Sequence, residues 1–218
     1  MRVLGIETST SQAGVALVEQ GRLVLARARA RPQQSAEQLL PLIAEVLAEA
    51  GWQRRDLERI GVSVGPGSFT GLRVGIACAQ GLSLGLGVPL LGVTSLRAMA
   101  RAVPESAVGT RVSLLDARRN EVFAGAHAAG PGCSELLAPR ALPRATAQSM
   151  LEAELTGPLV WTGSGLGLAG VAPSVSSPEI DEPSAHAVGL LAEELDPADC
   201  PSLPVYVRDA GATLPRPG

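Results

Sequence analysis

Residues 65–75, with the sequence GPGSFTGLRVG, follow the apolar run IGVSV and are rich in glycine. Glycine-rich turns after strands often hold phosphate, but a Walker A loop needs a lysine and a hydroxyl directly after its second conserved glycine. Here Leu72 follows Gly71, and the chain contains no lysine. This excludes a Walker A site and leaves two interpretations. Ser68 or Thr70 caps a helix in a turn without a ligand, or the backbone N–H groups of that helix meet an anion.

Two acids end apolar strands, Glu7 after VLGI and Asp116 after VSLL. Carboxylates at strand ends often bind metal ions or activate water, but a solvated loop gives the same pattern. If the glycine stretch contacts a nucleotide or another anion, we expect the contact at Glu7, Gly65, Gly67 and Ser68.

Other patterns predict no catalytic chemistry. GLGLAG at 165–170 matches G-x-G-x-x-G, but VAPSVSSP follows where a dinucleotide fold needs a helix, so we predict a loop. His127 and His186 are too far apart for a zinc pair on one helix. There is no G-x-S-x-G nucleophile elbow. We therefore expect no metal and no cofactor.

The helix predicted over 70–86 has an unusual number of small residues. Glycine costs about 1 kcal/mol relative to alanine inside a helix, so something must offset Gly81 and Gly85. Close approach of a second helix would do so, either within this chain or in a partner. The small residues that share one face, four positions apart, are Gly71, Gly75 and Ala79. Phe69 at the start favours a contact surface, and Gly75→Leu would test the close packing.

The elements that position these residues follow one plan twice. Strands are predicted at 3–7, 13–19 and 22–28, a helix at 35–50 with a capping box and an internal proline, a strand at 60–64, the helix 70–86, a strand at 88–93 and a short helix from 94 or 95. The second half has strands at 112–116, 121–127 and 158–162 and helices at 146–155 and 184–195. We predict an α/β protein of two related βββαβα subdomains, 1–104 and 105–218.

Composition limits the partners and the compartment. The 18 basic residues stand against 21 acids, giving a net charge of −3, so the chain by itself is a poor binder of nucleic acid. Three scattered cysteines and no signal-peptide pattern predict a reducing cytoplasm without disulfides. Residues 74–96 carry no charge, but Pro89 and five glycines divide them into helix, turn and strand, so we expect no membrane span.

Six motifs in order resemble the TsaB family, also called YeaZ: GIETS, SAEQLLPLI, GPGSFTGLRVGIACAQGL, LLGVTSL, LLDARRNEVFAG and PVYVRD. The resemblance implies the actin/Hsp70/sugar-kinase fold with two related subdomains. It also implies a role in making threonylcarbamoyladenosine in tRNAs that read codons beginning with A. In that family TsaB is the non-catalytic paralogue of TsaD, which binds the metal and transfers the threonylcarbamoyl group, and the ATPase TsaE completes the assembly.

The resemblance also implies where partners bind. The first two long helices, here 35–50 and 70–86, would pack against their counterparts in TsaD to form a heterodimer. TsaE would join the assembly, tRNA would bind only through the complex, and the isolated chain could pair with itself. The alternative is an enzyme, an ATP-using or peptidase-like member of the same fold, in which Glu7 or Asp116 binds magnesium. The expected interface residues are Ser35, Leu39, Ile43, Val46, Phe69, Gly71, Arg73, Gly75 and Ala79.

Overall fold

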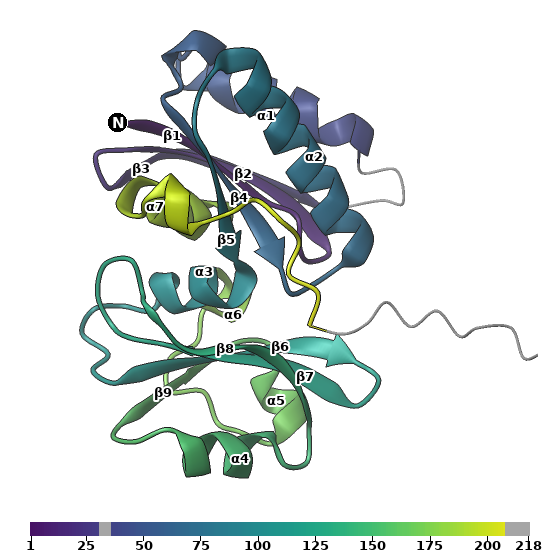
Figure 1. Cartoon of the computed structure of the whole chain (residues 1–218), viewed down its shortest axis with the longest axis vertical. Helices are drawn as coiled ribbons and strands as arrows, with labels where there is room; N and C mark the ends of the chain where they lie inside the picture. Colours follow the sequence, from purple (N-terminus) through teal and green to yellow (C-terminus); the bar gives the residue numbers. More distant parts are fainter. Residues whose placement is uncertain (31–35, 208–218) are drawn as a thin grey trace, which may run out of the picture.

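The computed structural model of the chain describes residues 1–30 and 36–207. In this part of the chain, the strands form a five-stranded sheet with the order β3-β2-β1-β4-β5 and a four-stranded sheet with the order β8-β7-β6-β9. Helices α3 and α7 lie between the two sheets, whereas α1 and α2 cover the outer face of the first sheet (Figure 1).

The first sheet begins with an antiparallel meander, and two further strands run parallel to β1. Leucine, isoleucine and valine side chains of β1, β2 and β4 pack against α1 and α2 and form the largest core cluster. This half consists of β1 (Arg2–Glu7), β2 (Gln12–Glu19), β3 (Arg22–Ala30), α1 (Ala36–Glu49), η1 (Arg54–Asp56), β4 (Arg59–Gly65), α2 (Phe69–Leu86), β5 (Leu90–Thr94) and α3 (Ser95–Ala102).

Both ends of α2 follow from local rules. The Ser68 hydroxyl accepts a hydrogen bond from the N–H of Gly71 at 3.4 Å, so Ser68 rather than Thr70 is the N-cap. At the other end Gly87 takes the left-handed conformation, with φ of 70°, and its N–H donates to the carbonyl of Ser83. The helix predicted over 70–86 is therefore confirmed to within one residue. The capping box predicted at Ser35 lies outside the described residues.

The second half repeats the plan of the first, as predicted. Its first three strands are antiparallel and its fourth runs parallel to β6. The sequence did not predict β8, and a one-turn helix, α5, occupies the segment 165–170 that we expected to be a loop. The elements are β6 (Thr110–Arg118), β7 (Glu121–His127), β8 (Glu135–Pro143), α4 (Ala147–Glu154), β9 (Leu159–Thr162), α5 (Leu166–Ala169), α6 (Pro178–Asp181), α7 (Ala185–Glu194) and η2 (Pro197–Asp199).

Helix α7 comes late in the chain but packs on β1, β2 and β4 of the first sheet. Glycines make this contact close. A Cβ on Gly5 would lie 2.1 Å from the carbonyl oxygen of Ala185, and one on Gly61 would lie 2.6 Å from the Cβ of Ala192. A division into 1–104 and 105–218 stays a prediction, and contacts of α7 cross that boundary.

Candidate functional site

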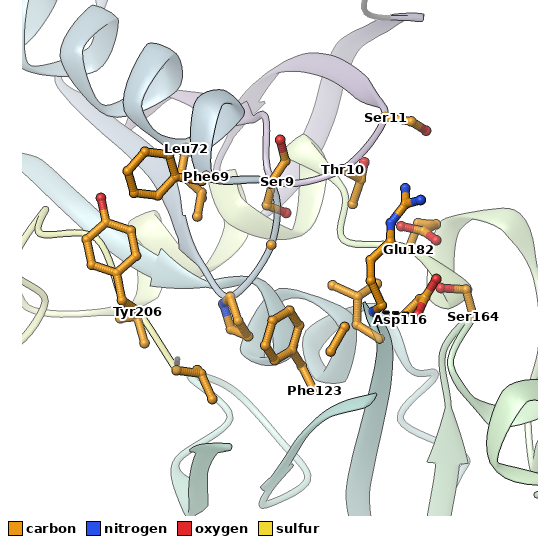
Figure 2. Close-up of a pocket in the computed structure, with 18 of the residues that line it drawn as sticks. Ser9, Thr10, Ser11, Phe69, Leu72, Asp116, Phe123, Ser164, Glu182 and Tyr206 are labelled. Carbon is orange, nitrogen blue, oxygen red and sulfur yellow. Dashed lines mark hydrogen bonds between the residues drawn. The ribbon is translucent and has the colours of Figure 1, made fainter. Parts of the chain in front are cut away.

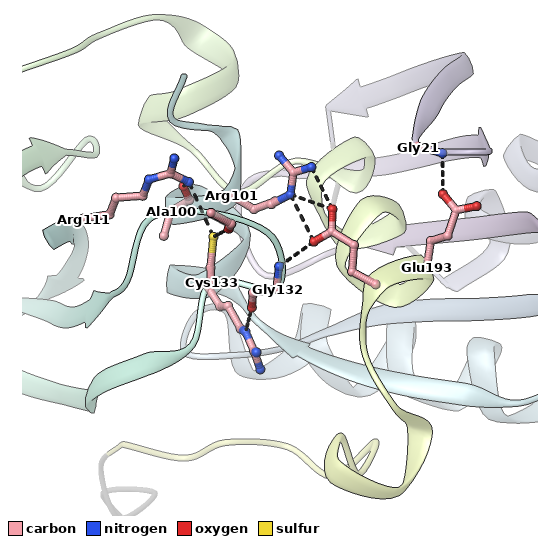
Figure 3. Close-up of polar contacts among 10 residues, drawn as sticks. Gly21, Ala100, Arg101, Arg111, Gly132, Cys133 and Glu193 are labelled. Carbon is pink, nitrogen blue, oxygen red and sulfur yellow. Dashed lines mark hydrogen bonds and ion pairs between the residues drawn. The ribbon is translucent and has the colours of Figure 1, made fainter. Parts of the chain in front are cut away.

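A cleft of about 620 Å³ opens between the two halves of the molecule (Figure 2). The loop after β1, the start of α2, the turn between β6 and β7 and the segment around Tyr206 all line it. Aromatic rings occupy one side, with Phe69, Tyr206 and Phe123, while Asp116 and Glu182 lie toward the other side. Both phenylalanines and the single tyrosine of the chain thus meet at this cleft.

Glycines let the loop after β1 approach the turn before α2. The carbonyl of Ser9 accepts a hydrogen bond from the N–H of Ser68 at 2.6 Å, and a Cβ on Gly67 would lie 2.4 Å from the same oxygen. The hydroxyls of Thr8 and Ser9 are buried and have no hydrogen-bond partner within the described residues. The glycine stretch therefore joins two loops closely and leaves polar groups beneath the cleft.

Asp116 is held by neighbouring basic residues. Its Oδ1 accepts hydrogen bonds from the backbone N–H of Arg118 and from the Arg144 guanidinium, both at 2.8 Å. Partial burial by itself raises the pKa of Asp116, but these two donors outweigh burial and hold the pKa below its usual value. Asp116 is thus an ionised partner of Arg144 at neutral pH.

The four residues expected at a nucleotide or anion do not gather at one place. Gly67 and Ser68 line the cleft. Glu7 is 3% exposed, accepts a hydrogen bond from the N–H of Ser9, and lines a second cavity of about 830 Å³ that shares Thr10, Ser11 and Glu182 with the first. Gly65, with φ of 103°, takes a conformation that favours glycine at the end of β4, and a Cβ there would lie 2.9 Å from Leu72.

The expected interface residues lie on two sides of their helices. Phe69 and Arg73 are exposed. In contrast, six others are buried, because the apolar stripe of α1 and the small-residue face of α2 both pack inward. A Cβ on Gly75 would lie 2.1 Å from the Thr8 hydroxyl, so Gly75→Leu would test the fold and not an interface. The buried residues are Leu39, Ile43, Val46, Gly71, Gly75 and Ala79.

The outward faces of the two helices consist of other residues. Leu84 of α2 is 88% exposed, and Leu40 of α1 is 54% exposed. Ala77, Gly81 and Gly85 are exposed beside Leu84. Neither Leu40 nor Leu84 was among the expected interface residues. Periodicity counts Leu40 with the apolar positions of α1, and Leu84 falls outside the small-residue face of α2. A large leucine among the small residues of α2 was the signal that could have found Leu84. The interface itself stays a prediction, now centred on these faces, and Ser35 lies outside the described residues.

Potential metal ligands are scattered in the described part of the chain. Within residues 1–30 and 36–207, no group of three or more histidine, cysteine, aspartate or glutamate side chains could hold a metal ion. His127 is fully buried, and burial, together with the charge of Arg97, lowers its pKa to about 4. Its two ring nitrogens have no hydrogen-bond partner among the described residues.

Comparison with known proteins matches the chain to proteins of tRNA modification. The sequence model of the family described as TsaD, tRNA N6-adenosine threonylcarbamoyltransferase, matches residues 29–134. The tRNA threonylcarbamoyladenosine biosynthesis protein TsaB of Escherichia coli K12 is 39% identical over 124 residues, which are 56% of this chain and 53% of that protein. The chain spans about half the length of the curated relatives it matches.

Two solved structures agree with the fold. A Pseudomonas aeruginosa protein described as similar to peptidase YeaZ superposes with a TM-score of 0.76 at 28% identity, over 95% of this chain and 99% of that one. Component A of (R)-2-hydroxyglutaryl-CoA dehydratase from Acidaminococcus fermentans superposes with a TM-score of 0.56 at 12% identity, over 88% and 97%. The second likeness concerns the fold alone.

The chain forms two sheets of the same plan, with helices packed between them and a cleft at their junction. This architecture is that of an α/β protein of the actin/Hsp70/sugar-kinase fold, as the resemblance implied. Within that class, the sequence and structure matches support assignment of the chain to the TsaB/YeaZ family.

Proposed function

We propose that this chain is a non-catalytic subunit in threonylcarbamoyladenosine biosynthesis that binds a TsaD protein through the outward faces of α1 and α2. The name of the Escherichia coli relative supports the pathway. The exposed apolar face of α2 is the observation that carries the binding role.

That face is apolar and poor in charge. Arg73 is the single charged residue among the 18 of α2, and only 28% of the helix is buried. Leu84 is almost fully exposed, and Leu40 is an exposed leucine of α1, which packs beside α2 (Figure 1). Monomeric soluble proteins rarely expose contiguous apolar patches beyond a few hundred Å². A protein partner that covers both helices would remove this surface from water.

A membrane is the other environment that such a helix suits. Within the described residues, α2 is long and apolar enough to cross a bilayer by length and composition. A single helix of this kind is weak evidence, because core helices of soluble proteins pass the same test. In this fold α2 packs on β4 through Leu72, Ile76 and Ala79, which supports a protein interface rather than a membrane span. The cytoplasmic location stays a prediction.

The other parts of the proposal rest on charge and sequence. The resemblance implies that the metal-binding paralogue uses an H-x-x-x-H pair, whereas the two histidines of this chain, His127 and His186, lie far apart in the sequence. Because this chain has a net charge of −3, we propose that the other members of the complex supply the positive surface that binds tRNA. We propose TsaE as a further member of that complex, and a homodimer as the arrangement in which the isolated chain covers the same helices.

The test is the pair of substitutions Leu40→Asp and Leu84→Asp, made together. Both side chains are exposed, so the variant should keep the unfolding midpoint of the wild type but lose at least roughly 100-fold in affinity for the TsaD protein of the same organism. Size-exclusion chromatography with light scattering and titration calorimetry measure complex formation, and a tRNA modification assay measures its consequence.

The matched control replaces an exposed leucine outside α1 and α2 by aspartate. Leu136 of β8 is 54% exposed, as Leu40 is, and lies on the second sheet. Leu136→Asp should bind TsaD with wild-type affinity. Absence of any complex with the wild-type chain, or full affinity of the double variant, would contradict the proposed function.

A nucleotide-binding enzyme is the second candidate, and one observation favours it. The unpartnered hydroxyl of Ser9 lies at a cleft that also holds Arg118 and Arg119, and no ion pair within the described residues uses either guanidinium. Titration of the isolated chain with ATP and magnesium tests this candidate. Tight, magnesium-dependent binding would favour the enzyme over the scaffold.

A further inference from the structure

The C-terminal part of the described chain lies against α2. After η2, the carbonyl of Cys200 accepts a hydrogen bond from the N–H of Gly92 at 2.9 Å, and the N–H of Val205 donates to the carbonyl of Val64 at 2.7 Å. The Gln80 side chain donates to the carbonyl of Ser202 at 3.4 Å. Residues 200–207 therefore run from the edge strand β5 to the start of α2, as the yellow segment in Figure 1 shows.

The segment ends in a cluster of three side chains that we name the Phe69–Arg73–Tyr206 cluster. The Phe69 and Tyr206 rings are 5.4 Å apart between centroids (Figure 2). The Arg73 guanidinium lies 3.9 Å above the Phe69 ring, and its Nε donates to the Tyr206 hydroxyl at 3.4 Å. Two aromatic contacts thus hold the guanidinium in one place at the first turns of α2.

This cluster is half exposed although it is aromatic. Phe69 is 43% exposed and Tyr206 is 48% exposed, and Arg73 is exposed as well. Tyrosine and arginine are enriched among the residues that contribute most to protein–protein binding. A guanidinium that is already held in place loses less side-chain entropy on binding than a free one. The cluster has both properties and adjoins the apolar face of α2.

Charge indicates what the cluster would contact. Arg73 is the single charge of α2, and no ion pair within the described residues includes it. On α1, by contrast, Glu45 and Glu49 are already paired with Arg29 and Arg27 of β3. An apolar partner surface that covers α2 would therefore bury a positive charge unless it supplied a negative one.

We propose that the Phe69–Arg73–Tyr206 cluster completes the partner-binding face, and that the partner protein places a carboxylate against Arg73. The C-terminal segment is then part of the interface, and Tyr206 is a positioning residue for Arg73. This inference rests on the proposed function, because it assigns a further part of the same face.

The experiment measures affinity of full-length variants for the TsaD protein at low and high salt. Arg73→Gln should lower the affinity roughly tenfold at low salt and flatten its salt dependence, since the ion pair is lost. Tyr206→Phe should cost roughly threefold, because it removes the acceptor but keeps the ring. Arg22→Gln, an exposed arginine of β3, is the charge control, and Leu136→Ala is the control for lost apolar area.

The outcomes separate this inference from the proposed function. Loss of salt dependence in Arg73→Gln but not in Arg22→Gln supports the ion pair. If Tyr206 only holds the C-terminal segment in place and does not position Arg73, Tyr206→Phe will show the salt dependence of the wild type. If Arg73→Gln and Tyr206→Phe both keep wild-type affinity and salt dependence while the Leu40→Asp/Leu84→Asp variant does not bind, the inference is wrong and the proposed function stands. Loss of self-association alone, or of binding to tRNA alone, in Arg73→Gln would also overturn it.

Discussion

Replacement of Gly5 by alanine is expected to lower the free energy of unfolding by about 3 kcal/mol, at the upper end of typical overpacking costs. The new Cβ would lie 2.1 Å from the carbonyl oxygen of Ala185 and 2.8 Å from the backbone nitrogen of Gly189. Both atoms belong to the backbone of α7, so no side-chain rotation relieves the contact. The helix would have to move away from β1, which would open the contact between α7 and the first sheet.

Urea unfolding followed by circular dichroism measures this effect, and Gly81→Ala is the control. A Cβ on Gly81 of α2 would meet nothing within 4 Å, so alanine there should stabilise the protein by up to about 1 kcal/mol through its higher helix propensity. The two glycine-to-alanine changes thus have opposite expected signs. Equal unfolding midpoints for Gly5→Ala and the wild type would disprove the close packing of α7 on β1.

Acid should destabilise the protein through His127. Burial, with a contribution from Arg97, lowers the pKa of this imidazole from 6.5 to about 4 in the folded state. Arg111 lies opposite it on β6 and Glu135 lies opposite it on β8. Between pH 6.5 and 4 the unfolded chain binds the proton and the folded chain does not, so stability falls as pH falls through this window. A shift of this size corresponds to about 3 kcal/mol in total.

His127→Leu removes the titrating group and isolates its effect from that of the carboxylates. The difference in unfolding free energy between this variant and the wild type should be constant above pH 6.5 and should grow in favour of the variant toward pH 4. His186, whose pKa burial and Arg101 also lower, is the comparison, and its partial burial predicts a smaller effect for His186→Gln. Titration of the His127 ring by NMR with a midpoint near 6.5 would refute the prediction.

Most secondary structure could be predicted from the sequence because its causes are local. The polar cap at Ser68 and the glycine at Gly87 define α2 within one helical turn of each end. The repeated order of strands and helices likewise predicted two sheets of one plan. Strand β8 escaped prediction because it is an edge strand with a single buried residue, Leu142, and an internal proline, Pro139.

The orientation of the candidate surface could not be predicted in the same way. Periodicity identified an apolar stripe on α1 through Leu39, Ile43 and Val46, but a stripe has the same spacing whether it packs on a sheet or on a partner. The small residues of α2 were ambiguous for the same reason, and the structure places Gly75 against Thr8. Leu40 and Leu84 can be recognised as candidate interface residues only after the structure shows which faces of α1 and α2 pack on the sheet.

By itself, the sequence determined most of the elements, their duplicated order, the lack of a Walker A lysine and the resemblance to the TsaB family. Each of these depends on residues within one motif or one helical turn. Only the tertiary structure decided that α7 packs on the first sheet and that Tyr206 joins Phe69 and Arg73. These contacts join residues more than a hundred positions apart. They form where two surfaces pack closely enough to exclude water, and local propensity does not encode which surfaces will meet.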